Sequence, residues 1–141
     1  RFRSAAEAKL DQLLSQQSPE GWFPEYGGFD IGYNSICLGH LALYAGRSDN
    51  NDAVAAAERV AEFIDVHIRE DGTYDPEPTS RRTQYVYPFG LAQIGRSDIL
   101  ARHAQGVIGN RVLQPAWMDD RFCIPLTLDY VQAYGVFQPC E

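Results

Sequence analysis

The sequence has few cysteines and no long apolar run. Its three cysteines, Cys37, Cys123 and Cys140, are odd in number and far apart. They therefore indicate neither a disulfide framework nor a metal site with C-x-x-C spacing. No apolar run reaches the roughly 18 residues that span a bilayer, and the first residues do not have the pattern of a secretory signal. These absences argue against a membrane protein and favour a reducing compartment such as the cytoplasm.

Basic residues are also scarce relative to acidic ones. The chain has 12 Lys and Arg against 19 Asp and Glu, a formal net charge of −7. A nucleic-acid-binding surface needs a basic stripe, so this balance argues against such a partner. No Ser/His/Asp order, phosphate-binding loop or His-rich cluster is visible either. We therefore expect no metal and no cofactor.

The 141 residues are enough for one domain with its own core. Hydrophobic residues make up 45% of the chain and charged residues 22%, which is ordinary for a globular protein. The chain begins with Arg1 rather than methionine and ends at Glu141. We expect it to be a piece of a longer protein.

An internal repeat of about fifty residues organises the sequence. The tetrapeptide GRSD occurs at 46–49 and again at 95–98, and AAE at 5–7 recurs at 56–58. At the same spacing as the two AAE segments, Gly21-Trp22-Phe23 aligns with Gly72-Thr73-Tyr74. Three matches in the same order at nearly one period indicate a repeat architecture.

Each unit predicts an outer helix, a loop and an inner helix. Apolar residues of the outer helices follow the 3–4 spacing of a helix buried on one side. In the first two units they are Phe2, Ala6, Leu10, Leu13, Leu14, Val54, Ala57, Val60, Ala61, Ile64 and Ile68. The first inner helix, 36–45, is apolar on nearly all sides and is expected to be buried all round, with Gly46 as its C-cap. Pro88 should kink the second inner helix or mark its first turn.

A third, degraded unit follows, in which 113–122 replaces the Gly-x-aromatic loop. No strand pattern competes with these helices. The predicted fold class is therefore all-α, with about six helices in three hairpins at 1–46, 51–95 and 98–137.

This pattern resembles the α/α-toroid superfamily. The stretch Gln17-Ser18-Pro19-Glu20-Gly21-Trp22-Phe23 is similar to the Gln…Gly-x-Trp repeat of squalene–hopene-type cyclases. The hairpin plan also resembles heparinase-II/III-like and alginate-lyase-like polysaccharide lyases. The resemblance implies an open arc of a toroid and a carbohydrate-active or related class of ligand.

Two departures limit what the resemblance implies. The cyclases use a D-x-D-D acid, whereas Met118-Asp119-Asp120-Arg121 lacks the first aspartate. Tyr33, Asn34 and His40 do not match a defined lyase motif. No catalytic residue is therefore carried over from either family.

In an arc of hairpins, the loops 18–32, 70–82 and 113–122 should lie together at one end. They hold most of the polar and aromatic residues, and long loops on a rigid scaffold tend to carry function. Aromatic faces beside carboxylates and arginine suit sugar rings. We therefore predict a glycan, with uronate-containing glycans included, or another small polar ligand as the partner, and lyase or hydrolase chemistry.

The predicted catalytic residues are Tyr33, Asp30, Glu25 and Arg82. The predicted substrate-binding residues are Tyr26, Asn34, Gln84, Tyr85, Arg81, Tyr74, Trp117, Asp119 and Asp120. In this scheme a carboxylate or Tyr33 acts as general acid or base, and Arg82 holds a substrate carboxylate. Asn34 and Gln84 would orient hydroxyl groups.

Several alternatives remain open at this level. Trp22 and Tyr74 could simply pack between hairpins, Asp30 could cap the inner helix, and His40 could be a core histidine. For the whole chain, the alternatives are a non-catalytic helical-repeat module that binds a glycan or a protein, and an isoprenoid-cyclase relative. Self-association of the arc is a further alternative.

Overall fold

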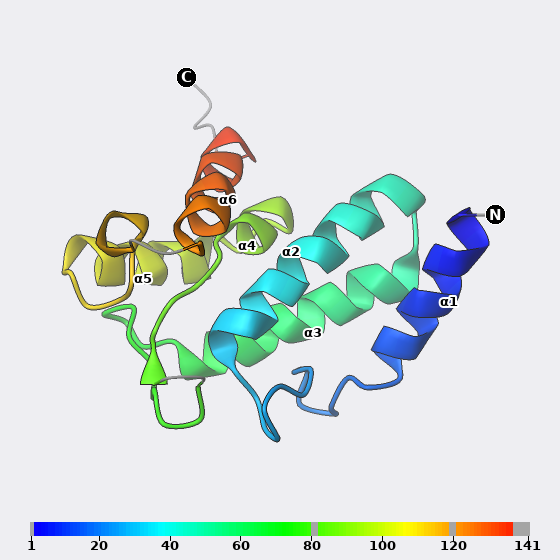
Figure 1. The fold of residues 1–141 in the computed structure, drawn as a ribbon, viewed down its shortest axis with the longest axis horizontal. Helices are drawn as coiled ribbons and strands as arrows, with labels where there is room; N and C mark the ends of the chain where they lie inside the picture. Colours follow the sequence, from blue (N-terminus) through cyan, green and yellow to red (C-terminus); the bar gives the residue numbers. More distant parts are fainter. Residues whose placement is uncertain (1, 80–81, 119–120, 137–141) are drawn as a thin grey trace.

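The structure, a computed structural model, describes residues 2–79, 82–118 and 121–136 and is built from helices (Figure 1). Within these ranges there is no β-strand, only an isolated bridge between Glu25 and Gly28. The predicted all-α class with about six helices is therefore confirmed. The elements are α1 (Phe2–Leu14), α2 (Ile31–Ser48), α3 (Asn51–His67), α4 (Phe89–Gln93), α5 (Ser97–Ile108), the 3-10 helix η2 (Pro115–Trp117) and α6 (Cys123–Val136).

The helices form two series. The inner series α2, α4 and α6 contact one another in succession, whereas α1 contacts α3 in the outer series. Arg102 ties α5 to α3 by donating to the carbonyl oxygens of Asp65 and Ile68, at 3.2 and 2.8 Å. A Cβ on Gly90 of α4 would lie 2.6 Å from the backbone nitrogen of Gly39 in α2. Only glycine permits this close approach between the first two inner helices.

The Gly-x-aromatic loops form the same turn twice. Ser18 N–H donates to Trp22 O and Arg69 N–H donates to Thr73 O, both at 2.8 Å. The glycines of these turns have φ of 98° at Gly21 and 79° at Gly72. This left-handed conformation favours glycine, since side chains rarely adopt it. The segments 18–23 and 69–74 are therefore equivalent, and we call them the repeat joints.

Each repeat joint also packs against the next outer helix. A Cβ on Gly21 would overlap the carbonyl of Arg59 in α3, and one on Gly72 would overlap the carbonyl of Arg102 in α5. Glycine is thus required at both positions for two reasons, the positive φ and the lack of space for a Cβ. Gln17 adds a further tie, since its Nε2 donates to Ala56 O at 3.0 Å. The repeat in the sequence is therefore accompanied by a repeat of contacts in the structure.

A side-chain amide locks each repeat joint from the inner side. Asn34 Oδ1 accepts from Phe23 N–H, and Gln84 Oε1 accepts from Tyr74 N–H, both at 2.7 Å. Phe23 is 6% exposed and Tyr74 0% exposed, so these backbone groups are shielded from water. A buried backbone N–H needs such a partner. The two amides therefore hold the aromatic residue of each joint in the core.

The inner helices of the first two units differ in length. α2 has 18 residues and α4 has 5. Residues 83–88 form no helix, and Tyr74 Oη donates to the carbonyl of Tyr85 at 2.8 Å instead. Pro88 then occupies the N-cap position of α4. Since proline disfavours the helical conformation of the residue before it, the helix does not extend back to Tyr87.

Three local expectations are wrong. Gly46 lies inside α2, and the left-handed C-cap is Asp49, with φ of 50°. His40 is exposed rather than buried, because α2 has neighbours on only part of its circumference. In α1, Leu10 is buried but Phe2 is 93% exposed, so the predicted apolar face is only partly used.

Burial shifts the pKa of a histidine and an aspartate in the third hairpin. His103 of α5 is 3% exposed, and its Nε2 lies 2.7 Å from Tyr130 Oη of α6. Burial lowers the pKa of His103 from 6.5 to about 4. Asp129 of α6 accepts from Phe89 N–H at 2.7 Å, and burial raises its pKa from 3.8 to about 6. Both groups therefore favour their neutral forms in the fold.

Candidate functional site

A tight turn in the loop before α2 presents an exposed tyrosine. Glu25 N–H donates to Gly28 O at 2.8 Å and Gly28 N–H donates to Glu25 O at 3.0 Å. Between them Tyr26 and Gly27 both have positive φ, 51° and 85°, as in a type I′ turn. Tyr26 is 75% exposed. A tyrosine in the left-handed region is uncommon and strained, which marks this position for a role outside the fold itself.

Four tyrosines from three segments meet beside this turn. Tyr26 and Tyr33, in the first turn of α2, have ring centroids 5.7 Å apart and hydroxyl oxygens 3.5 Å apart. The Tyr33 and Tyr85 rings meet edge to face at 6.4 Å, and the Tyr85 and Tyr87 rings at 5.9 Å. We call these four residues the tyrosine cluster. It joins the loop of the first unit to the extended segment of the second.

Glycine makes room for the cluster at the start of α2. A Cβ on Gly32 would overlap the ring of Tyr85, so this ring lies directly over the first helical turn. Burial, followed by the negative charges of Asp30 and of neighbouring tyrosines, raises the pKa of Tyr85 well above its usual value. The Tyr85 hydroxyl therefore stays protonated far into the alkaline range.

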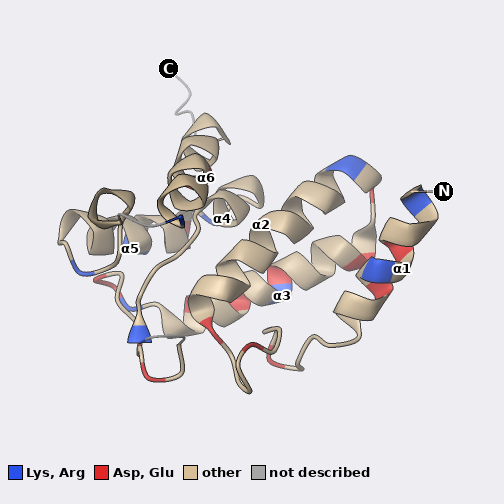
Figure 2. Cartoon of the chain, viewed as in Figure 1, with Lys and Arg blue, Asp and Glu red and all other residues tan. Residues whose placement is uncertain are grey.

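Glu25 precedes Tyr26 in the turn, and it is half-buried. Burial, with a smaller contribution from the Glu25 charge, raises the pKa of Cys37 to about 11. Cys37 is therefore a neutral thiol at physiological pH and not a nucleophile. Figure 2 shows acidic residues along the loop that leads into α2. The described part of this loop thus adds negative charge beside the tyrosines.

Two of the predicted site residues have structural roles. Asp30 is 1% exposed and is the N-cap of α2, where its Oδ1 accepts from Tyr33 N–H at 3.0 Å. Asn34 is also 1% exposed, and besides Phe23 N–H it bonds the carbonyls of Phe23 and Asp30, at 3.1 and 2.9 Å. The Asn34 amide is thus committed to backbone groups and does not reach a ligand.

The equivalent residues of the second unit behave in the same way. Gln84 bonds Tyr74 N–H, and Tyr74 is a fully buried core residue. Burial raises the pKa of Tyr74 well above its usual value. The expectations that Asn34 and Gln84 orient hydroxyls and that Tyr74 binds substrate are therefore replaced by roles in the fold.

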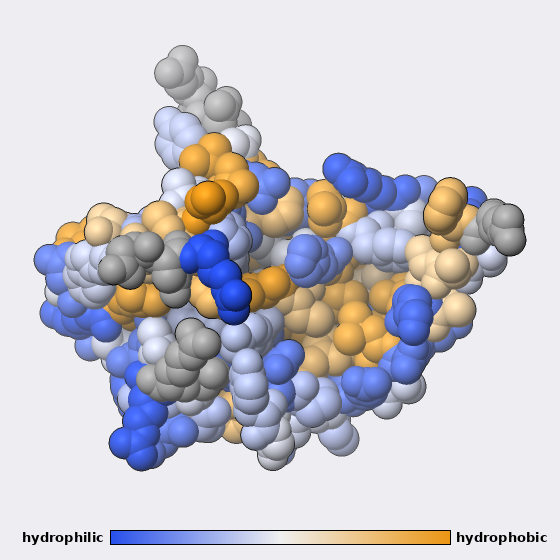
Figure 3. All heavy atoms as spheres, viewed as in Figure 1, coloured by the Kyte–Doolittle hydropathy of each residue, from blue (hydrophilic) through white to orange (hydrophobic). Residues whose placement is uncertain are grey.

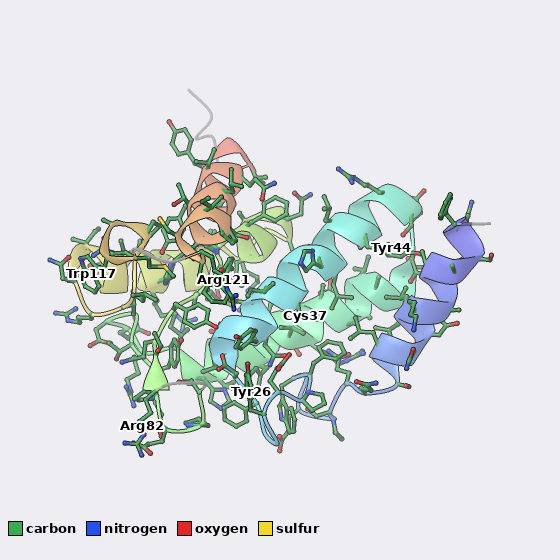
Figure 4. The ribbon with its side chains drawn as sticks, in the orientation of Figure 1. Tyr26, Cys37, Tyr44, Arg82, Trp117 and Arg121 are labelled. Atoms are coloured by element: carbon green, nitrogen blue, oxygen red, sulfur yellow. The ribbon has the colours of Figure 1, made fainter. Side chains whose placement is uncertain are left out.

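Arg82 and Trp117 lie apart from the cluster. Arg82 Nη2 lies 3.3 Å from Glu77 Oε2, and both side chains are largely exposed, 73% and 65%. In Figure 4 the Arg82 side chain points away from the molecule, and Trp117 lies at a distance from Tyr26. Trp117, on η2, is 50% exposed. Among the described residues of the three predicted loops, only Tyr26 of the loop 18–32 therefore belongs to the cluster, since Tyr33 lies in α2 and Tyr85 and Tyr87 follow the loop 70–82.

The remaining predicted residues, Arg81, Asp119 and Asp120, lie outside the described residues. Of the predicted set, the structure brings together Tyr26, Tyr33 and Tyr85, and Glu25 precedes Tyr26 in the turn.

Sequence reasoning missed Tyr87. Tyr87 is 7% exposed and its N–H donates to Ser35 Oγ of α2 at 2.9 Å. The alternation Tyr85-x-Tyr87 before Pro88 was the available signal, since alternate residues of an extended segment face the same side.

No protein-family model, curated protein or solved structure matches the chain. Among the described helices, none is long and apolar enough to cross a membrane. Within the same ranges, His, Cys, Asp and Glu side chains do not gather in groups of three that could hold a metal ion.

Proposed function

We propose that this chain binds a glycan across the tyrosine cluster. The observation that carries the proposal is Tyr26, which is held exposed by a strained left-handed backbone and lies against Tyr33. A protein core gains nothing from such a residue, whereas an exposed aromatic ring can stack on the C–H face of a sugar. Phenol hydroxyls beside the ring then supply hydrogen bonds to sugar hydroxyls.

The charges around the cluster favour recognition of hydroxyl groups over carboxylates. Asp30 is close enough to Tyr85 to raise its pKa, Glu25 precedes Tyr26 in the turn, and Arg82 is turned to Glu77. The two acidic groups would repel a uronate carboxylate. We expect neutral glycans to bind more tightly than uronate-containing ones.

The proposal is tested with Tyr26→Gly. Glycine removes the ring and relieves the left-handed φ, so the free energy of unfolding should stay equal or rise by about 0.5 kcal/mol. Affinity for the best glycan should fall about tenfold. Binding is measured by affinity electrophoresis in gels that contain neutral or uronate polysaccharides, and then by calorimetry.

The matched control is Tyr134→Ala, which removes a tyrosine of similar exposure, 72%, from α6. It should leave glycan affinity unchanged. The proposal fails if no glycan of the panel binds, or if both variants bind as the unaltered chain does.

Lyase chemistry on a uronate is the second candidate. The observation that favours it is the pairing of the Tyr26 and Tyr33 hydroxyls, 3.5 Å apart, which places two groups that can carry a proton side by side. In such an elimination a base removes the proton next to the carboxylate, the glycosidic C–O bond breaks, and the leaving oxygen takes up a proton. Tyr33→Phe would then abolish the ultraviolet absorbance of the unsaturated product. If no such absorbance develops with any uronate glycan, binding alone remains.

A further inference from the structure

A groove between α5 and α6 combines an apolar lining with a buried polar pair. Its volume is about 520 Å³, within the range of roughly 300–1,000 Å³ that small-molecule sites occupy. Leu100, Ala104 and Val107 of α5 supply apolar surface, and His103 and Tyr130 supply polar groups. Among the described residues that line the groove, none is Asp, Glu, Lys or Arg. The α5–α6 groove, as we call it, therefore offers a ligand apolar surface and hydrogen-bonding groups without a fixed charge.

The polar pair distinguishes this groove from other exposed apolar surface. Ile124, Leu128 and Val131 of α6 are 67%, 57% and 62% exposed, and Figure 3 shows apolar residues on the surface of this helix. Such exposure alone identifies no ligand. In the groove, however, His103 Nε2 lies 2.7 Å from Tyr130 Oη, and His103 Nδ1 is buried without a hydrogen-bond partner among the described residues. Since buried polar atoms are nearly always hydrogen-bonded, this nitrogen points to a partner that arrives with a ligand.

The chemistry of the pair selects an uncharged hydroxyl group. Burial lowers the pKa of His103 to about 4, so its imidazole is neutral at physiological pH. A neutral imidazole has one donor and one acceptor nitrogen, and the Tyr130 hydroxyl can take either role toward Nε2. Nδ1 then has the role that Nε2 does not have. A hydroxyl group both donates and accepts, so it can satisfy Nδ1 in either case.

A carboxylate suits this groove less well. Burial, with a smaller contribution from the negative charge of Asp129, raises the pKa of Tyr130 well above its usual value. Asp129 therefore lies close enough to Tyr130 to repel an anion that approaches the pair. The lining residues named above include no cation that could offset this repulsion.

We propose that the α5–α6 groove binds an uncharged and mainly apolar small molecule, such as a hydroxylated aromatic compound, whose hydroxyl group bonds to the His103–Tyr130 pair. The apolar body of the ligand lies against Leu100, Ala104 and Val107, where binding removes apolar surface from water. No lining residue of the groove belongs to the tyrosine cluster, so this site is separate from the proposed glycan site.

The first test is the binding of 2-naphthol to the purified chain, measured by calorimetry. Ala104→Trp places a large ring in the groove from an exposed position on α5, so it should weaken binding at least tenfold. Ala8→Trp, at an exposed position on α1 away from the groove, is the matched control and should bind normally. The proposal is overturned if 2-naphthol does not bind, or if the two variants bind it equally well.

The second test separates recognition of the hydroxyl group from apolar burial. The double variant His103→Leu/Tyr130→Phe removes both members of the pair together, so no buried polar group is left unpaired and the fold should be retained. Its affinity for 2-naphthol should fall about tenfold, whereas its affinity for 2-methylnaphthalene should stay unchanged. Equal losses for these two probes contradict the proposal. So does tighter binding of 2-naphthoate than of 2-naphthol by the unaltered chain.

A second copy of the chain is the alternative occupant of the groove. Sedimentation velocity of the unaltered chain and of Ala104→Trp distinguishes it from a small molecule. A mass of two copies that Ala104→Trp reduces to that of one would show that a second copy fills the groove, which overturns the proposal. Circular dichroism and thermal unfolding establish that each variant folds.

Discussion

The first two hairpins and the third follow one plan but are closed in different ways. In the first two, the repeat joint seats a glycine on the next outer helix and a side-chain amide locks the aromatic residue. The described residues of the third show neither feature, and their contacts include His103 with Tyr130 and Asp129 with the start of α4. The difference shows that one part of the fold is closed by shape and neutral hydrogen bonds, and the other by groups that can titrate.

Breaking the glycine joint should have the largest effect. Gly21→Ala strains a φ of 98° and drives a Cβ into the Arg59 carbonyl, so the free energy of unfolding should fall by about 3 kcal/mol. Gly27→Ala is the control, since Gly27 has positive φ but nothing within 4 Å of the added Cβ. It should cost about 1 kcal/mol. Urea denaturation measures both, and equal losses would show that packing against α3 is unimportant.

Removing the amide locks should have a smaller effect that differs between the two hairpins. Asn34→Ala leaves buried partners of three hydrogen bonds unsatisfied, so a loss of about 2 kcal/mol is expected. Gln84→Ala removes the bond to Tyr74 from a less buried residue and should cost about 1 kcal/mol. Thermal unfolding compares the two. A larger loss of stability for Gln84→Ala would show that the second repeat joint contributes more to the stability of the fold than the first.

The smallest effect is a pH dependence confined to the third hairpin. The pKa of His103 is lowered to about 4, so between about 6.5 and 4 the unfolded chain takes up the proton and stability falls as pH falls. The pKa of Asp129 is raised to about 6, so between about 6 and 3.8 the folded chain holds the proton and stability rises as pH falls. The two contributions oppose each other, and on going from pH 7 to 5 their sum should be a net loss of about 1 kcal/mol.

His103→Gln separates these contributions, because glutamine does not titrate. The variant should lose less stability than the unaltered chain on acidification from pH 7 to 5, and the Asp129 contribution should then act alone. Asp129→Asn should do the opposite and steepen the acid loss. Urea denaturation at the two pH values checks both, and an unchanged pH profile in His103→Gln would show that His103 is not the titrating group.

Much of the first two hairpins could be predicted from the sequence, because their signals are local. The repeat of Gly-x-aromatic placed both repeat joints, since glycine is required wherever φ is positive and the backbones touch. The aspartate before Ile31 pointed to the N-cap of α2, which the structure has at Asp30. Of the candidate site, Tyr26, Tyr33 and Tyr85 were among the predicted residues. The glycan partner and the toroid resemblance remain predictions.

What the sequence determined by itself is the helical class, the repeat and its joints, because periodicity and glycine φ depend on near neighbours along the chain. Only the tertiary structure decided which polar groups are already hydrogen-bonded or ion-paired within the fold. Asn34 and Gln84 bind backbone groups that lie 10 or 11 residues away, and Arg82 is paired with Glu77. It also decided that Tyr85 contacts both Tyr33 and Tyr87, and that His40 faces solvent. These outcomes depend on how elements pack, and a hydrogen bond or ring contact between distant segments leaves no spacing that one sequence can reveal.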